Sequence, residues 1–483
     1  MKAIQGLDPK VLWRHFWDIS QIPRESGKEA GISEHISNLA RRCGLVCRFD
    51  ETGNILVKKP GRPGAPSVAL QSHMDMVCEK DAQTVHDFNT DPIRLMRDGD
   101  WIRADGTTLG ADNGIGVAIM LAIMEDTSLV HPEIELLFTV EEETGLTGAN
   151  NLRRVFFSAN TLLNLDSEDE GCFSIGCAGG MDTELVFGLT FEETPANTEA
   201  ITLKITGLKG GHSGVNIHEG YGNAIKLLNR FLCATLPKYG FHLAEFQGGN
   251  KRNAIPREAE ALIHVTKEGL RGLRKDAKTW TNIFRSEFES IDDGITIIIE
   301  KNAHPAQRII SRPDADRIFN LLQALPHGPV KNDIRLDNAV VTSTNLAVCA
   351  FGNNMFVITT SQRSLMQSSL NDITSQVRAI GELAGCRVIH SNGYPAWKPN
   401  FASPVLKTCT EMYKGLYGIE ARVKVVHAGL ECAVIGEKVA GLDMISFGPT
   451  IEQPHSPYER VHIQSVGRFW EYLTALLRHM AGQ

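Results

Sequence analysis

Four short apolar runs restrict the fold of this chain more than any other sequence feature. They are Val68–Leu70, Ile134–Val140, Thr161–Leu165 and Met444–Phe447. Short apolar runs that are bounded by turns and separated by helical patterns are typical of buried parallel strands. The first three lie in the N-terminal part of the 483-residue chain, whereas the fourth lies near its C-terminus. We therefore predict an α/β domain with a mainly parallel sheet that is interrupted by an inserted segment.

The inserted segment, residues 186–392, has the pattern of a small α+β unit that occurs twice. Its first half predicts the order β-α-β-β-α-β and ends with a strand at Ile295–Glu300. The second half repeats this order less clearly and starts at or near that strand. We therefore expect two domains. Residues 1–185 and 393–483 form one, and residues 186–392 form an inserted domain that is a doubled β-α-β-β-α-β unit.

The composition excludes several classes of protein. Hydrophobic residues make up 42% and charged residues 22% of the chain, which excludes a mainly disordered protein. The net charge is −8 and no basic stripe occurs, so we expect no nucleic-acid partner. No apolar stretch approaches the roughly 18 residues that span a bilayer, and the N-terminus lacks a signal-peptide core. Ten cysteines without a CxxC pair are typical of reduced thiols, so we expect a cytoplasmic protein without membrane association.

Acids or histidines follow predicted strands at five places. In an open α/β sheet, ligands bind beyond the carboxyl ends of the strands, so loops that are distant in sequence can meet there. The five places are His73-Met74-Asp75, Asp112-Asn113, Glu141-Glu142-Glu143, Asp166-Ser167-Glu168 and His455-Ser456-Pro457-Tyr458-Glu459. Each also has a structural interpretation when taken alone, as a hydrogen-bonded loop histidine, a solvated glutamate run or a helix cap. Because an apolar strand directly precedes the acid in three cases, the joint pattern favours a metal site.

The types of side chain in this pattern indicate which metal it would bind. Two histidines with several carboxylates suit zinc or another borderline divalent ion, whereas calcium prefers oxygen ligands alone. Such a set has room for two ions about 3.5–4 Å apart, which share one carboxylate and hold a hydroxide between them. Hydrolysis at such a site also needs a free carboxylate as a proton shuttle. The run Glu141-Glu142-Glu143 can supply both a ligand and that base.

The motifs of this chain resemble those of a known family, the di-zinc peptidases that include carboxypeptidase G-like enzymes, aminotripeptidases and cytosolic dipeptidases. They occur in the family's order over nearly the whole chain. They are Ser72-His73-Met74-Asp75, Gly110-Ala111-Asp112-Asn113-Gly114, Glu142-Glu143 ahead of Gly145, Leu165-Asp166, Gly210-Gly211-His212-Ser213-Gly214, Asn253-Ala254-Ile255-Pro256 and His455-Ser456-Pro457. The closer resemblance is to the aminoacyl-histidine (Xaa-His, carnosinase-like) dipeptidase branch. It rests on the sequence from Ser72 to Lys80, on Val85-His86-Asp87-Phe88 and on the long insert.

The resemblance implies a role for each matched residue of the interrupted domain. Two zinc ions, with cobalt or manganese as substitutes, would be held by His73, Asp112, Glu143, Asp166 and His455. Asp112 would be the bridging carboxylate, and the peptide bond after it would be cis. Asp75 would orient the ring of His73. Glu142 would be the general base, although the register within the glutamate run, counted back from Gly145, could differ by one residue.

The resemblance also implies that the inserted domain is a lid over the substrate. His212 would stabilise the oxyanion. Asn253 and Arg363 would hold the substrate, with Arg363 on its terminal carboxylate, because a guanidinium matches a planar carboxylate with two hydrogen bonds. In relatives with a single lid unit, a dimer partner supplies the histidine. Here a doubled lid could let His212 act within its own chain, so both a monomer and a homodimer remain open.

Together these implications describe a metal-dependent dipeptidase. It would hydrolyse Xaa-His dipeptides, carnosine-like ones included, and other short unblocked dipeptides, through a metal-bridged hydroxide and the base Glu142. The preference for histidine rests on the resemblance alone. One alternative is a related amidohydrolase that removes an acyl group from an amino acid. Another is a non-catalytic peptide-binding protein, which would be expected to lack a ligand or the base, whereas all six positions are present.

Overall fold

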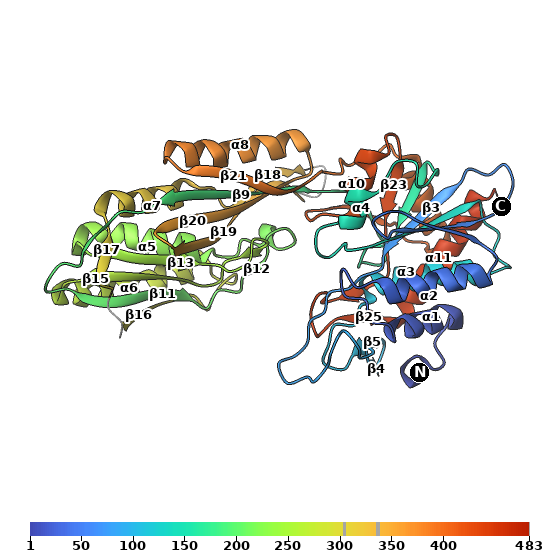
Figure 1. The fold of residues 1–483 in the computed structure, drawn as a ribbon, viewed down its shortest axis with the longest axis horizontal. Helices are drawn as coiled ribbons and strands as arrows, with labels where there is room; N and C mark the ends of the chain where they lie inside the picture. Colours follow the sequence, from blue (N-terminus) through green and yellow to red (C-terminus); the bar gives the residue numbers. More distant parts are fainter. Residues whose placement is uncertain (303–305, 335–338, 483) are drawn as a thin grey trace. The chain divides into compact units, whose positions relative to one another are not determined.

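The chain folds into two compact units (Figure 1). The structure is a computed structural model that describes residues 1–302, 306–334 and 339–482. Unit 1 comprises residues 1–177, 397–425 and 430–483, and unit 2 comprises residues 178–396 and 426–429. The expected boundaries after residues 185 and 392 both fall inside unit 2. The first of them cuts strand β9 (Gly179–Gly188), which pairs on both edges with strands of unit 2 and therefore belongs to that unit.

A mixed eight-stranded sheet forms the centre of unit 1, with the strand order β1-β2-β6-β3-β7-β23-β8-β22. The four apolar runs of the sequence are its middle strands, namely β3 (Val68–His73), β6 (Ile134–Thr139), β7 (Thr161–Asn164) and β23 (Asp443–Ser446). These four are mutually parallel and almost wholly buried. Around them lie β1 (Val46–Phe49), β2 (Ile55–Lys59), β8 (Cys172–Cys177) and β22 (Arg422–Val426). The predicted α/β fold with parallel central strands is therefore confirmed.

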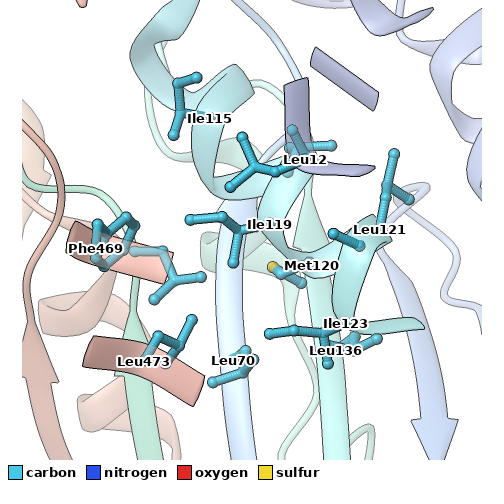
Figure 2. Close-up of a cluster of buried hydrophobic side chains, with 14 of the residues drawn as sticks. Leu12, Leu70, Ile115, Ile119, Met120, Leu121, Ile123, Leu136, Phe469 and Leu473 are labelled. Carbon is cyan, nitrogen blue, oxygen red and sulfur yellow. The ribbon is translucent and has the colours of Figure 1, made fainter. Parts of the chain in front are cut away.

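Helix α3 (Ala111–Glu125) runs through the core of unit 1. Every side chain from Ile115 to Met124 is buried, as expected of a helix that is apolar on all sides. Figure 2 shows Ile119 and Met120 among Leu12, Leu70 and Leu136. Burial of each such side chain contributes about 1.5–3 kcal/mol to stability. This packing holds the first turn of α3, which carries Asp112, in a fixed place relative to the sheet.

The other helices of unit 1 lie mostly where apolar periodicity predicts them. They are η1 (Lys2–Ile4), α1 (Lys10–Ser20), α2 (Ala30–Arg42), α4 (Thr147–Asn151), α9 (Pro404–Tyr417), α10 (Glu431–Lys438) and α11 (Ile463–Met480). Local caps decide where several helices of the chain begin. The Ser403 side chain accepts a hydrogen bond from the Leu406 amide at the start of α9. In unit 2, the Asn223 side chain does the same for Lys226, so α5 begins at Ala224 and not at Tyr221 as its apolar pattern indicates.

A second, four-stranded antiparallel sheet in unit 1 was not predicted from the sequence. Its order is β24-β25-β5-β4. Its strands are β4 (Leu95–Asp98), β5 (Trp101–Ala104), β24 (Ile451–Glu452) and β25 (Arg460–His462). They are short and partly exposed, so no run of apolar residues reveals them. The sheet matters because β24 and β25 flank the loop that carries His455.

Unit 2 contains two copies of the β-α-β-β-α-β unit in one nine-stranded sheet. The first copy is β11 (Glu199–Thr206), α5 (Ala224–Tyr239), β13 (His242–Gly248), β15 (Ala259–Val265), α6 (Lys267–Glu287) and β16 (Thr296–Lys301). The second is β9, α7 (Arg312–Ala324), β19 (Ala339–Gly352), β20 (Met355–Ser364), α8 (Gln367–Leu383) and β21 (Arg387–Tyr394). The strand orders, β16-β11-β15-β13 and β21-β9-β20-β19, are equivalent. The predicted duplication is thus present.

The two copies are joined edge to edge and are nested in sequence. Strands β13 and β19, which are equivalent, pair at Gly248 and Cys349. The expectation that the second copy starts at or near Ile295–Glu300 is wrong, because its first strand is β9. The first copy is inserted between β9 and α7. Shorter strands complete the unit, namely β10 (Phe191–Glu193) with β17 (Arg308–Ile310), β12 (Gly211–His212) with β14 (Ala254–Ile255), and β18 (Gly328–Asp333) beside β19, together with helix η2 (Ile217–Glu219).

All ten cysteines are free thiols. Over the residues that the structure describes, none of the helices combines the length and the apolar character that crossing a bilayer requires.

Candidate active site

The five loops with acids and histidines meet at one edge of the central sheet of unit 1. Their donor atoms form three groups, and within each group the atoms lie within 4.8 Å of one another. The groups are His73 with Asp112 and Asp166, Asp112 with Glu143 and His455, and His73 with Glu142 and Glu143. The structure therefore brings all five predicted metal ligands and the predicted base together, although they come from five separate segments.

Asp112 lies between the two histidines. Its Oδ1 is 3.1 Å from Nε2 of His73, and its Oδ2 is 3.2 Å from Nε2 of His455. On the outer sides, Asp166 Oδ1 is 3.5 Å from His73 Nε2, and Glu143 Oε2 is 3.1 Å from His455 Nε2. The peptide bond between Asp112 and Asn113 is cis. The arrangement is two three-residue groups that share one carboxylate.

The electrostatics of the cluster fit divalent cations. Burial alone would lower the pKa of His73, but Asp166 and Asp112 raise it well above its usual value. Contacts with Asp112 and Glu143 likewise overcome burial and raise the pKa of His455 to about 11. Oε1 of Glu143 is buried without a hydrogen-bond donor, which is rare for a buried acceptor. The concentration of negative charge that favours protonated imidazoles would equally favour bound cations.

Asp75 connects the loop after β3 to the glutamate run. Its Oδ1 lies 3.3 Å from Nδ1 of His73 and accepts the Glu142 amide at 3.1 Å. Its Oδ2 accepts the Glu143 amide at 3.1 Å and the Ser26 hydroxyl at 2.7 Å. Although burial opposes ionisation, the His73 ring and these donors lower the pKa of Asp75 to about 2. One buried carboxylate thus positions both a histidine ring and the two glutamates.

Glu142 and Glu143 turn into the cluster, whereas Glu141 belongs to none of the three groups. Burial raises the pKa of Glu142 well above its usual value, and the charge of Glu143 raises it further against the effect of His73. A carboxyl group with a raised pKa binds a proton more readily than an ordinary glutamate does, which suits a group that takes up a proton and returns it. The geometry therefore favours the register in which Glu142 is the base and Glu143 a ligand.

Two buried charged residues, to which the sequence analysis assigned no role, hold the loop of Asp112. Glu459 accepts four backbone N–H groups, those of Leu109 (2.7 Å), Gly110 (2.8 Å), Ala111 (2.7 Å) and Asp112 (3.2 Å). Arg24 donates to the carbonyls of Met74 (3.0 Å), Asp75 (2.8 Å) and Gly110 (2.5 Å). Burial raises the pKa of Glu459 to about 7. Together they join the loops of His73 and Asp112. The sequence contained one signal for the role of Glu459, namely its position four residues after His455.

The predicted substrate-binding residues all lie in unit 2. His212 and Asn253 line one cavity of about 560 Å³ beside the β12–β14 ladder. Nδ1 of His212 accepts the amides of Gly214 (3.2 Å) and Val215 (3.1 Å). When Nδ1 is an acceptor, the proton of a neutral imidazole is on Nε2. His212 therefore presents Nε2–H as a hydrogen-bond donor.

Arg363 is on β20 and does not line this cavity. Its Nη1 donates to the Tyr394 hydroxyl at 2.6 Å. Its neighbour His427, which the sequence analysis did not single out, accepts or donates a 2.7 Å hydrogen bond with Ser343 Oγ. Burial, followed by the charge of Arg363, lowers the pKa of His427 to about 3. The segment 426–429 thus adds a neutral histidine to the group that contains Arg363 and His212.

We predict that Glu459→Gln weakens the metal centre. A carboxamide has one acceptor oxygen where the carboxylate has two, and its NH₂ would face backbone donors. The loop of Asp112 should then loosen, and metal affinity should fall about 10–100-fold, the range seen when groups behind metal ligands are removed. Titration of the metal-depleted protein with zinc measures this. Glu452→Gln is the control, because the Glu452 carboxylate pairs with Arg460 and not with the backbone amides of that loop. Equal affinities in both variants would contradict the role of Glu459.

Comparisons with known proteins place the chain in a family. The sequence profile of peptidase family M20/M25/M40 matches residues 69–479. The cytosol non-specific dipeptidase of Escherichia coli K12 is 40% identical over 483 residues, which cover 99% of each chain. The crystal structure of aminoacylhistidine dipeptidase from Vibrio alginolyticus is similar with a TM-score of 0.86 and 40% identity, covering 99% of this chain and 98% of that one. A tripeptidase from Staphylococcus aureus shares the fold at 17% identity and a TM-score of 0.58, covering 99% and 100%. The family resemblance drawn from the motifs is confirmed, and the chain belongs to peptidase family M20/M25/M40.

Proposed function

We propose that this protein is a cytoplasmic dipeptidase that uses two divalent cations to hydrolyse unblocked dipeptides. Zinc is the cation that we propose. The observation that carries the proposal is that Asp112 is shared by two groups of side chains that could each hold a metal ion. The relatives at 40% identity support the substrate class, since one is named a non-specific dipeptidase and the other an aminoacylhistidine dipeptidase. We therefore include Xaa-His dipeptides, such as β-alanyl-histidine, within a broader range.

His73, Asp112 and Asp166 would hold one cation, and Asp112, Glu143 and His455 the other. Two histidines among carboxylates suit zinc, cobalt or manganese. When bound, such cations polarise a scissile carbonyl and lower the pKa of water. The orphaned Oε1 of Glu143 supports this assignment, because a cation would satisfy it.

Glu142 is the proposed general base of the reaction. It takes a proton from the attacking water and returns it to the amine that leaves. Its raised pKa favours the protonated state that must form between these two steps. Asp75 fixes the backbone of Glu142 through the 3.1 Å amide contact, so the base stays in place as its charge changes.

Unit 2 is the proposed lid, and three of its residues act on the substrate. His212 donates its Nε2–H to the oxygen of the scissile carbonyl as negative charge develops there. Arg363 binds the terminal carboxylate, for which a guanidinium is geometrically suited. Asn253, which lines the same cavity as His212, holds the substrate. A carboxylate held at one end of the site explains a preference for very short peptides.

Glu142→Ala should keep its metal and lose most of its activity. Loss of a positioned base typically lowers the rate about 10²–10⁴-fold. We would measure kcat on a dipeptide together with the metal content of the same preparation. Glu141→Ala is the matched control, since it changes the neighbouring glutamate that is outside the cluster. A Glu142→Ala enzyme with a near wild-type rate would refute the assignment.

His212→Ala should lower kcat about 10²–10³-fold, as removal of an oxyanion donor does, with metal content unchanged. His218→Ala changes an exposed histidine in η2, six positions further along the chain, and should have little effect. Loss of metal from His212→Ala would instead identify His212 as a ligand.

A substrate panel tests the activity itself. We expect hydrolysis of several dipeptides including β-alanyl-histidine, loss of activity with a chelator and recovery on addition of zinc. N-acyl amino acids should be poor substrates. Rapid deacylation with no dipeptide cleavage would favour the related amidohydrolase, and binding without turnover would favour a peptide-binding protein.

A further inference from the structure

A second cluster of metal-binding side chains lies in unit 1, on the N-terminal helices. His15 and Asp18 are three residues apart on α1, a spacing that places both on one face of the helix. His35 comes from α2. One ligand atom from each lies within 4.8 Å of the other two. None of these residues belongs to the five segments of the candidate active site.

Two buried nitrogens in this cluster have no hydrogen-bond partner. His15 is 2% exposed, and its Nδ1 is buried and unpaired. Nε2 of His35 is also buried and unpaired. Buried polar atoms nearly always have a partner, so two orphaned imidazole nitrogens on residues of one cluster need an explanation. A bound cation would satisfy both.

The other nitrogen of His15 has the environment of a metal-bound histidine. Its Nε2 lies 3.1 Å from Oε2 of Glu125, at the end of α3. Metal-binding histidines usually use their second nitrogen for such a carboxylate contact, which orients the ring. Burial lowers the pKa of both His15 and His35, which favours the neutral imidazole that binds metals.

We propose that His15, Asp18 and His35 form a site for one divalent cation of the zinc type, separate from the paired site. Two imidazoles and one carboxylate favour zinc over calcium. Asp18 and His35 are half-buried, so solvent can reach the site and water can complete the coordination. The ion links α1 to α2, and Glu125 extends this link to α3. The role of this ion is therefore structural, since none of the residues of the proposed reaction belongs to its site.

Zinc stoichiometry in four full-length proteins tests the proposal. They are the wild type, His35→Gln, Asp112→Ala and the double variant, each stripped of metal and dialysed against zinc. We expect His35→Gln to bind one ion fewer than the wild type. We expect Asp112→Ala to keep one tightly bound ion, which the double variant loses. Equal stoichiometry in the wild type and His35→Gln would overturn this site. Equal stoichiometry in the wild type and Asp112→Ala would instead overturn the paired site, so the two failures are distinguishable.

Thermal unfolding in the Asp112→Ala background gives a second measurement. Zinc should raise the melting temperature of the protein in which the His15, Asp18 and His35 site is intact. It should not do so in His35→Gln or in Asp18→Asn. The second of these substitutions preserves the volume of the side chain. Glu125→Gln should weaken zinc binding about 10–100-fold without abolishing it. His479→Gln, a change of an exposed histidine on α11, is the control and should retain the full shift. A shift of the same size in all the variants would overturn the proposal.

Discussion

The concentration of carboxylates around Asp112 is the interaction on which the rest of this structure depends. Like charges held this close repel one another, so the cluster persists only where opposite charge and fixed donors surround it. His73 and His455 lie on either side of Asp112, and Asp75 and Glu459 fix the loops through backbone amides. The apolar helix α3 holds the first turn rigidly against the sheet. Core packing, buried hydrogen bonds and the chemistry of the cluster are therefore coupled.

Duplication in unit 2 resolves a different physical problem. A single β-α-β-β-α-β unit leaves its second strand at an edge with unpaired backbone groups, which invites pairing with another chain. Here β13 and β19 meet at Gly248 and Cys349, and β18 pairs with another part of β19, so these edges are partly covered within the chain. Because the first copy, which carries His212, is nested within the second, both copies come from one chain.

Sequence patterns predicted the parts of this fold whose signal is local. The four central strands, α11 and the first copy in unit 2 have apolar runs or helical periodicity that a window of a few residues reveals. The strand β9 was misplaced because nothing in its own sequence shows that its partners lie far along the chain, in β20 and β21. The small sheet around β25 was missed because its strands are short and half-exposed. Arg24, Glu459 and His427 received no role from the sequence because each contacts residues that are distant along the chain.

The sequence by itself determined which chemistry is available. Acids and histidines directly after apolar strands must gather at the carboxyl edge of the sheet, so the ligand types and their approximate meeting place follow from local patterns. The resemblance implied the place of Asp112 between the two histidines, and the tertiary structure brings these side chains together. Only the tertiary structure decided which nitrogen of His212 carries the proton. It also brought His15, Asp18 and His35 together. These features depend on side-chain directions and on contacts between distant segments, and packing of the whole chain sets both.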